Sequence, residues 1–164
     1  MAFPNTWYGS LDPAGKLNNM ESVKSEVKMM MDPNANPYAA PASDAPLARL
    51  GAKDVADLSW KSLMDAYTCT ECGRCTSVCP ANQTGKKLSP RKIMMDTRDR
   101  LEEVGKNIDQ HGMEFQDGKS LLGDYISVEE IRACTTCNAC VEACPVLINP
   151  VDIIVDLRRY LTLE

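Results

Sequence analysis

Apolar residues along this chain recur every three or four positions in several segments, which is the spacing of an α-helix with one buried face. No segment shows the alternation of apolar and polar residues that is typical of a half-buried strand. We therefore predict an all-α fold. The helices are expected at about 20–31, 58–67, 90–105, from Ser127 onward, and 150–161.

Residues that begin helices stand at the start of three of these segments. Ser89 and Asn149 are each followed by a proline, so each can act as an N-cap with proline at the first helical position. Ser127 and Glu130 have the spacing of a capping box. Between these helices, 106–126 is predicted to be a polar connection with a short turn near 120–122.

The first third of the chain differs from the rest in composition. Residues 1–53 hold more than half of the prolines and none of the cysteines. We predict an N-terminal arm over 1–53, with one short helix ended by Asp32 and Pro33 and a linker after it, and a compact domain over 54–164. The apolar face of the short helix either packs on the core of this chain or docks on a partner subunit. Its residues are Met20, Val23, Val27, Met30 and Met31.

All eight cysteines lie in two matching windows. Residues 69–80 (CTECGRCTSVCP) and 134–145 (CTTCNACVEACP) both have the form C-x2-C-x2-C-x3-C-P. The similarity continues into the helix that follows each window, so the domain is predicted to consist of two pseudo-repeated units of helix, cysteine motif and helix. The positions shared by the two following helices are Pro90 and Pro150, Ile93 and Ile153, Asp96 and Asp156, Arg98 and Arg158, and Leu101 and Leu161.

Composition and charge narrow the chemistry. The net charge of −5, with acidic and basic residues interspersed, gives no sign of nucleic-acid binding. The sequence has neither a signal peptide nor an apolar run long enough to span a membrane, which predicts a cytoplasmic location. Thiols remain reduced there, so grouped cysteines indicate metal binding and not disulfides. The single histidine, His111, is interpreted as a surface residue.

The cysteine spacing is typical of iron–sulfur clusters. In two-cluster bacterial ferredoxins of this spacing, three cysteines bind one [4Fe–4S] cluster and the fourth, which precedes proline, binds the other. Structural zinc normally uses two separated pairs of ligands, so it is the weaker alternative. The prediction is two [4Fe–4S] clusters with crossed ligands. Cluster I takes Cys69, Cys72, Cys75 and Cys144, and cluster II takes Cys134, Cys137, Cys140 and Cys79.

The rest of the sequence offers no evident substrate site. It contains no nucleotide-binding glycine pattern and no cysteine outside the two motifs, so no catalytic residue is predicted. Basic residues near the motifs could offset the negative charge of the clusters, although each is interpreted first as an ordinary solvated charge. These residues are Arg74, Lys86, Lys87, Arg91 and Arg132.

The two motifs, separated by a long helical insert, resemble the helical ferredoxin module found in the C and D components of heterodisulfide reductase. The same module occurs in the iron–sulfur component of anaerobic glycerol-3-phosphate dehydrogenase. The resemblance covers about 54–161 and implies an α-helical ferredoxin fold, the crossed ligation given above, and transfer of electrons between partner subunits.

A second resemblance concerns residues 2–8 (AFPNTWY). They are similar to a segment of bacterial iron–sulfur oxidoreductases that follows a haem b membrane domain and precedes the ferredoxin module and a cysteine-rich catalytic domain. We therefore expect a module of a respiratory oxidoreductase, held at the inner face of the membrane by a partner or flanking domain, or else a small subunit of a complex similar to heterodisulfide reductase. The alternatives are a free-standing dicluster ferredoxin and, in another class, an interaction module stabilised by zinc.

Overall fold

The computed structural model describes residues 16–17, 20–33 and 50–164, and their regular elements are helices and helical turns. Within these residues the only pairing of the β type is an isolated bridge between Leu122 and Ile126, so the expected all-α class is confirmed. No helix in the described part of the chain has the length and apolar character needed to cross a bilayer. The elements are α2 (Glu21–Met31), η1 (Val55–Asp57), α3 (Trp60–Thr68), α4 (Arg74–Ser77), α5 (Pro80–Gln83), α6 (Pro90–His111), η2 (Leu121–Tyr125), α7 (Val128–Ala133), α8 (Ala139–Glu142) and α9 (Pro150–Leu163).

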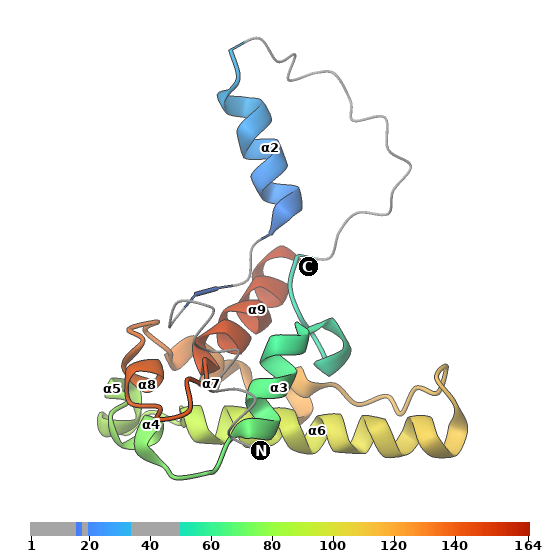
Figure 1. The fold of residues 1–164 in the computed structure, drawn as a ribbon, viewed down its shortest axis with the longest axis vertical. Helices are drawn as coiled ribbons and strands as arrows, with labels where there is room; N and C mark the ends of the chain where they lie inside the picture. Colours follow the sequence, from blue (N-terminus) through green and yellow to red (C-terminus); the bar gives the residue numbers. More distant parts are fainter. Residues whose placement is uncertain (1–15, 18–19, 34–49) are drawn as a thin grey trace.

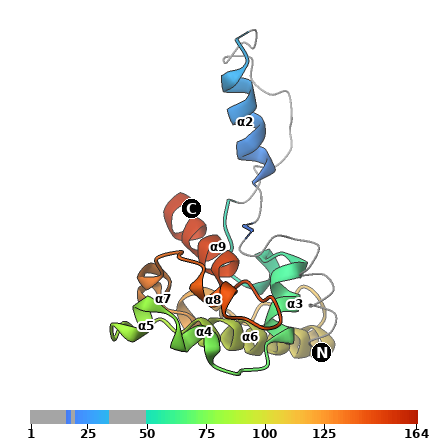
Figure 2. The same cartoon turned by 60° about the vertical axis from the view of Figure 1, so that its left-hand side comes forward.

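Helix α6 forms one side of the domain, and α3 and α9 pack against it (Figure 1). The short helices α4 and α8, one from each cysteine motif, lie side by side near the beginning of α6 (Figure 2). Most buried apolar residues of both repeats meet in one core between these elements, and a smaller cluster contains Cys140, Val141 and Val151. The fully buried large side chains include Ile93, Met94, Leu121, Ile126, Ile131, Ile153, Ile154 and Leu157.

The predicted helix caps are present. The Ser89 side chain accepts a hydrogen bond from the Lys92 backbone N–H, and the Asn149 side chain accepts one from the Asp152 N–H, both at 3.3 Å. Ser127 and Glu130 form the expected capping box at the start of α7. These bonds satisfy backbone donors that the first turn of a helix leaves without partners.

Two helix boundaries differ from the predictions. Helix α6 continues through Gly105 to His111, and Gly112, with φ of 89°, stands at its C-cap. A glycine inside a helix costs only about 1 kcal/mol, whereas the left-handed backbone at Gly112 ends the helix. Helix α3 begins at Trp60 because the Ser59 side chain caps it, at 3.1 Å from the Ser62 N–H.

The connection after α6 is held by a buried arginine. Arg100 is only 3% exposed, and it donates to Asp54 at 2.7 Å, to Asp117 at 2.5 Å and to the Lys119 carbonyl at 2.8 Å. The turn expected near 120–122 is found as η2. These bonds fasten the connection between the repeats to the segment that precedes α3.

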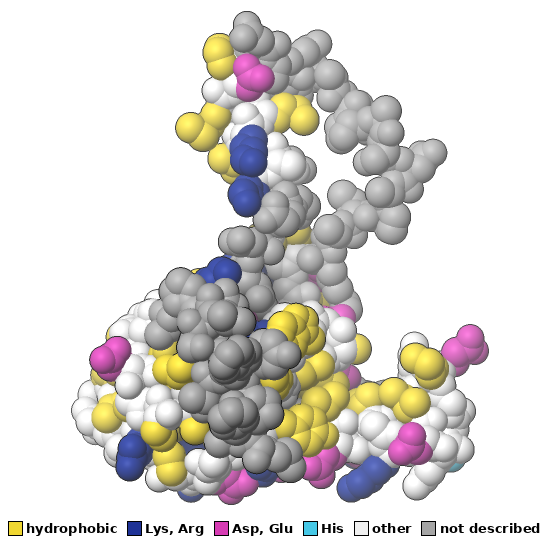
Figure 3. All heavy atoms as spheres, in the orientation of Figure 1, with side chains coloured by type: hydrophobic (Ala, Val, Ile, Leu, Met, Phe, Trp, Pro, Cys, Tyr) yellow, Lys and Arg dark blue, Asp and Glu magenta, His cyan; other side chains and the backbone are white. Residues whose placement is uncertain are grey.

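Helix α2 confirms the short helix expected in the first third of the chain, and it ends before Asp32 as predicted. Its apolar side chains are exposed, since Val27, Met30 and Met31 keep 47%, 77% and 79% of their accessible surface. Figure 3 shows hydrophobic side chains beside lysines on this helix, which projects from the domain. The expectation that this face packs on the chain's own core is therefore wrong for the described residues.

Candidate iron–sulfur centres

The two cysteine loops have the same backbone shape. In the first loop, Glu71 and Gly73 have positive φ angles of 58° and 80°. In the second, Thr136 and Asn138 occupy the equivalent positions with φ of 54° and 60°. A left-handed residue on each side of the second cysteine reverses the chain direction locally, so the loop curves around the space that its cysteines border. One helical turn, α4 or α8, then carries the third cysteine.

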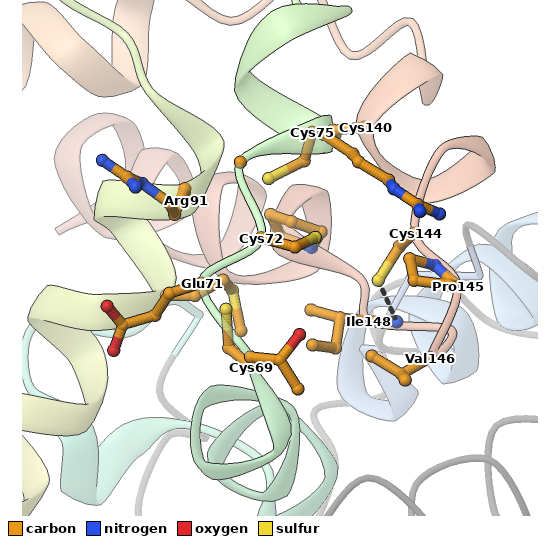
Figure 4. Close-up of a pocket in the computed structure, with 15 residues that line it drawn as sticks. Cys69, Glu71, Cys72, Cys75, Arg91, Cys140, Cys144, Pro145, Val146 and Ile148 are labelled. Carbon is orange, nitrogen blue, oxygen red and sulfur yellow. Dashed lines mark hydrogen bonds between the residues drawn. The ribbon is translucent and has the colours of Figure 1, made fainter.

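The first loop borders a cavity into which the second motif also reaches. Cys69, Cys72 and Cys75 line it from the first loop, and Cys144 lines it from the end of the second motif (Figure 4). Cys140 contributes to the same lining. The sulfur of Cys144 accepts a hydrogen bond from the Ile148 backbone N–H at 3.4 Å, and this bond fixes its direction. Five thiols from two distant parts of the chain therefore line one space.

The second group brings the last cysteine of the first motif to the second loop. Burial raises the pKa of Cys134, and negative charge at Cys79 and Cys137 raises it further. Burial also raises the pKa of Cys140 to about 12, with contributions from Cys134, Cys75 and Cys79. A thiol acts on another thiol in this way only at short range, so Cys79 lies near Cys134 and Cys140 of the second loop, and Cys140 also lies near Cys75 of the first.

The thiols differ in exposure within each group. Cys79 and Cys140 are buried, whereas Cys72 and Cys137 are exposed at the tips of the two loops. At the exposed tip, the backbone N–H of Ala139 lowers the pKa of Cys137. Each loop therefore has one exposed thiol, whereas both buried thiols are ones that the sequence prediction assigns to the second cluster.

This donor set fits a [4Fe–4S] cluster. Within the described residues, no three His, Cys, Asp or Glu side chains converge closely enough to hold a single metal ion. The sulfurs of the first group surround a cavity instead, which is the arrangement that a cube with four separate iron corners requires. Burial raises the pKa of Cys69 and Cys75, so holding four thiolates there requires a cationic centre such as iron.

The basic residues predicted to lie near the motifs have different surroundings. Arg74 and Arg91 line the first cavity and are exposed. Lys87 forms an ion pair with Glu129 at 2.6 Å. Arg132 borders a separate surface cavity, and Lys86 is exposed.

His111 lies in the last turn of α6, exposed and stacked on Phe115 with 4.4 Å between ring centroids. This position agrees with its interpretation as a surface residue. It lines neither the cavity of the first group nor the loops of the second.

Two arginines that contact the cysteine loops were missed as candidates. Arg98 donates to the Glu71 carboxylate in the first loop at 2.5 Å. Arg158 donates to the carbonyls of Ile131 and Cys134 at the start of the second loop. The signal that could have identified them was their shared position in the repeat, eight residues after each helix-initiating proline.

The similarity to known proteins covers the same part of the chain. Residues 68–148 match the family described as "4Fe-4S dicluster domain". A "Probable iron-sulfur-binding oxidoreductase FadF" of Bacillus subtilis is 39% identical, over 69% of this chain and 20% of the relative. A "Probable membrane-anchored ferredoxin" of Chromohalobacter salexigens is 38% identical, over 74% of this chain and 20% of the relative.

A shorter relative is named as part of a different enzyme. One component of the "Ferredoxin/F(420)H(2)-dependent CoB-CoM heterodisulfide reductase" of Methanosarcina acetivorans is 32% identical, over 62% of this chain and 49% of the relative. The chain thus spans about a fifth of the length of the first two relatives and about half of the third. No solved structure matches the chain. Residues 2–8, which carried the second resemblance, lie outside the described residues.

Proposed function

Since this chain belongs, through residues 68–148, to the 4Fe-4S dicluster domain family and carries two [4Fe–4S] clusters, we propose that it is the electron-relay segment of a larger membrane-associated oxidoreductase. The observation that carries the proposal is that thiols of both motifs line one cavity and that Cys79 of the first motif acts on Cys134 and Cys140 of the second. No other cysteine exists in the chain. Each cluster, when bound, takes up one electron and gives it back.

The ligand sets that we propose are crossed. Cys69, Cys72, Cys75 and Cys144 would hold one cluster, and Cys134, Cys137, Cys140 and Cys79 would hold the other. The lining of the first cavity by Cys144 and the short-range action of Cys79 on Cys134 and Cys140 support this assignment. Pro80 and Pro145 direct the chain away after the fourth cysteine of each motif, so this cysteine is free to serve the other site.

The protein's own residues position the clusters and give partners access to them. The buried thiols of Cys79 and Cys140 would form the inner side of the second site. The exposed Cys72 and Cys137 lie at the loop tips, where a docked partner approaches each cluster most closely. Transfer from one partner to another then requires only that each partner docks over a different loop tip.

The names of the relatives guide the choice of partners. They include an oxidoreductase, a membrane-anchored ferredoxin and a component of a heterodisulfide reductase, all longer than this chain. We infer partner subunits or flanking domains of two kinds, a haem b domain in the membrane and a cysteine-rich catalytic domain. The domain over 54–164 would lie at the inner face of the membrane, and the arm over 1–53 would connect it to a partner.

Metal analysis of the anaerobically purified chain tests the proposal. We expect about eight iron and eight acid-labile sulfide per chain, and two [4Fe–4S] signals by electron paramagnetic resonance (EPR) after reduction. Two zinc ions and no sulfide would instead identify an interaction module stabilised by zinc. Iron-loaded chain that cannot be reduced and reoxidised in repeated cycles would also contradict an electron relay.

A further inference from the structure

The pseudo-repeat places an arginine beside each cysteine loop, but the two arginines have different partners. Arg98 lies in α6 and Arg158 in α9, each eight positions after the first proline of its helix. Both side chains are partly buried and reach the beginning of the loop of their own repeat. The repeat alone would therefore give both clusters the same electrostatic environment.

In the first repeat a carboxylate neutralises the arginine. The Arg98 guanidinium and the Glu71 carboxylate are 2.5 Å apart, with side-chain exposures of 22% and 39%. Figure 4 shows the Glu71 carboxylate turned away from the cavity. The pair thus brings almost no net charge to the first site.

In the second repeat the matching carboxylate is missing. Thr136, a neutral residue, occupies the loop position of Glu71. Arg158 donates to the Ile131 carbonyl at 2.9 and 2.5 Å and to the Cys134 carbonyl, and it forms no ion pair with a carboxylate among the residues that the structure describes. The other basic residue beside it, Arg132, carries a charge of the same sign and is exposed.

We propose that Arg158 raises the reduction potential of the cluster that includes Cys134, whereas the Arg98–Glu71 pair leaves the potential of the cluster that includes Cys69 nearly unchanged. Reduction adds one negative charge to a cluster, and an uncompensated cation nearby stabilises the reduced form. Arg158 is partly buried, so water and salt screen its charge less. Arg74 and Arg91 at the first cavity are exposed, so water and salt screen their charges more. This inference rests on the proposed function only in placing Cys134 and Cys69 in different clusters.

The test is a redox titration, followed by EPR, of the chain with both clusters reconstituted. Arg158→Gln should make one cluster about tenfold harder to reduce, a shift of about 59 mV for one electron, and should leave the other cluster unchanged. Arg158→Lys keeps the charge and loses the paired hydrogen bonds, so its potentials should stay near those of the parent. Glu71→Gln should shift the other cluster in the opposite direction.

The matched control is a double substitution that leaves the net charge unchanged. Arg98→Gln combined with Glu71→Gln removes one charge of each sign. We expect the equilibrium constant for reduction of each cluster to change by less than a factor of about two. Unchanged potentials in Arg158→Gln with about eight iron still bound would overturn the inference and leave the proposed function intact. If Arg158→Gln loses its clusters, Glu71→Gln decides the matter, since an unshifted potential in that variant also overturns it. Failure of the parent chain to bind iron would contradict the proposed function instead.

Discussion

The two cysteine loops have nearly the same backbone, but the segments that follow them differ. After the first motif, α5 and a further turn lead to the 22-residue helix α6, whereas only a short link separates the second motif from the 14-residue helix α9. The last part of α6 has no counterpart in α9, and its neighbours are the connection and the segment around Asp54. The shared part of the repeat therefore builds the two sites, and the unshared part builds the scaffold between them.

The largest expected effects come from the fourth cysteine of each motif, which we assign to the cluster of the other motif. Replacing Cys79 by Ser should remove the cluster of the second loop, about half of the iron, because we assign Cys79 to the cluster of Cys134 and Cys140, on which it acts electrostatically. Cys144→Ser is the matched variant and should remove the cluster of the first loop. Mössbauer or EPR spectra of the two variants should be complementary. If each variant lost the cluster of its own motif instead, the crossed assignment would be wrong.

Arg100 holds the connection between the two repeats to the segment before α3. Its counterpart in the second repeat is Tyr160, so the interactions of this arginine belong to the first repeat alone. Arg100→Met leaves the partly buried carboxylates of Asp54 and Asp117 without their cation, and we expect a loss of about 3 kcal/mol in unfolding free energy. In a chain of this length, the midpoint of anaerobic thermal unfolding should fall by on the order of 10 °C.

Lys119→Met is the control for Arg100, because it also removes one cation from the connection. Lys119 is 52% exposed and pairs with Glu103, so its loss should cost less than about 1 kcal/mol. Equal effects of the two substitutions would show that burial of Arg100 does not determine how firmly the connection is held.

Sequence patterns identified the parts of the molecule that repeat. The caps at Ser89, Ser127 and Asn149 are local hydrogen bonds between residues three positions apart, so spacing alone predicted them. The same holds for the cysteine motifs, since the cluster chemistry requires a fixed spacing. The division of the thiols into two crossed sets comes from the known behaviour of such motifs and not from local pattern, and it stays a prediction.

Long-range contacts could not be predicted in this way. The partner of Arg98 is 27 residues away and the partner of Arg158 is 24 to 27 residues away, and no local pattern specifies such pairs. The end of α6 was missed because Gly105 was taken as a stop, although a helix tolerates one exposed glycine. The exposure of α2 likewise depends on where the helix lies and not on its own residues.

A close approach at the beginning of the domain gives a smaller effect. Gly51 lies against α9, where an added Cβ would overlap the backbone of Arg159 and Tyr160. Gly51→Ala should therefore lower the unfolding free energy by about 2 kcal/mol, as overpacking does. Gly105→Ala is the control with the opposite sign, because that position faces open space in α6 and alanine should stabilise the helix by about 0.5–1 kcal/mol. Thermal unfolding of both variants measures the difference, and destabilisation by both would contradict the close approach.

The smallest effects concern the two caps that the repeats share. Ser89→Ala and Asn149→Ala each remove one side-chain acceptor from the first turn of a helix, and each should cost about 1 kcal/mol. Asn149 also donates to the Lys16 carbonyl at 2.7 Å, a contact that Ser89 does not have. Asn149→Ser can still cap α9 but cannot reach Lys16, so thermal unfolding of this variant separates the two roles. We expect Asn149→Ser to be nearly as stable as the parent, since an exposed hydrogen bond contributes little. A loss as large as that of Asn149→Ala would mean that the contact to Lys16, and not the cap, stabilises this end of the second repeat.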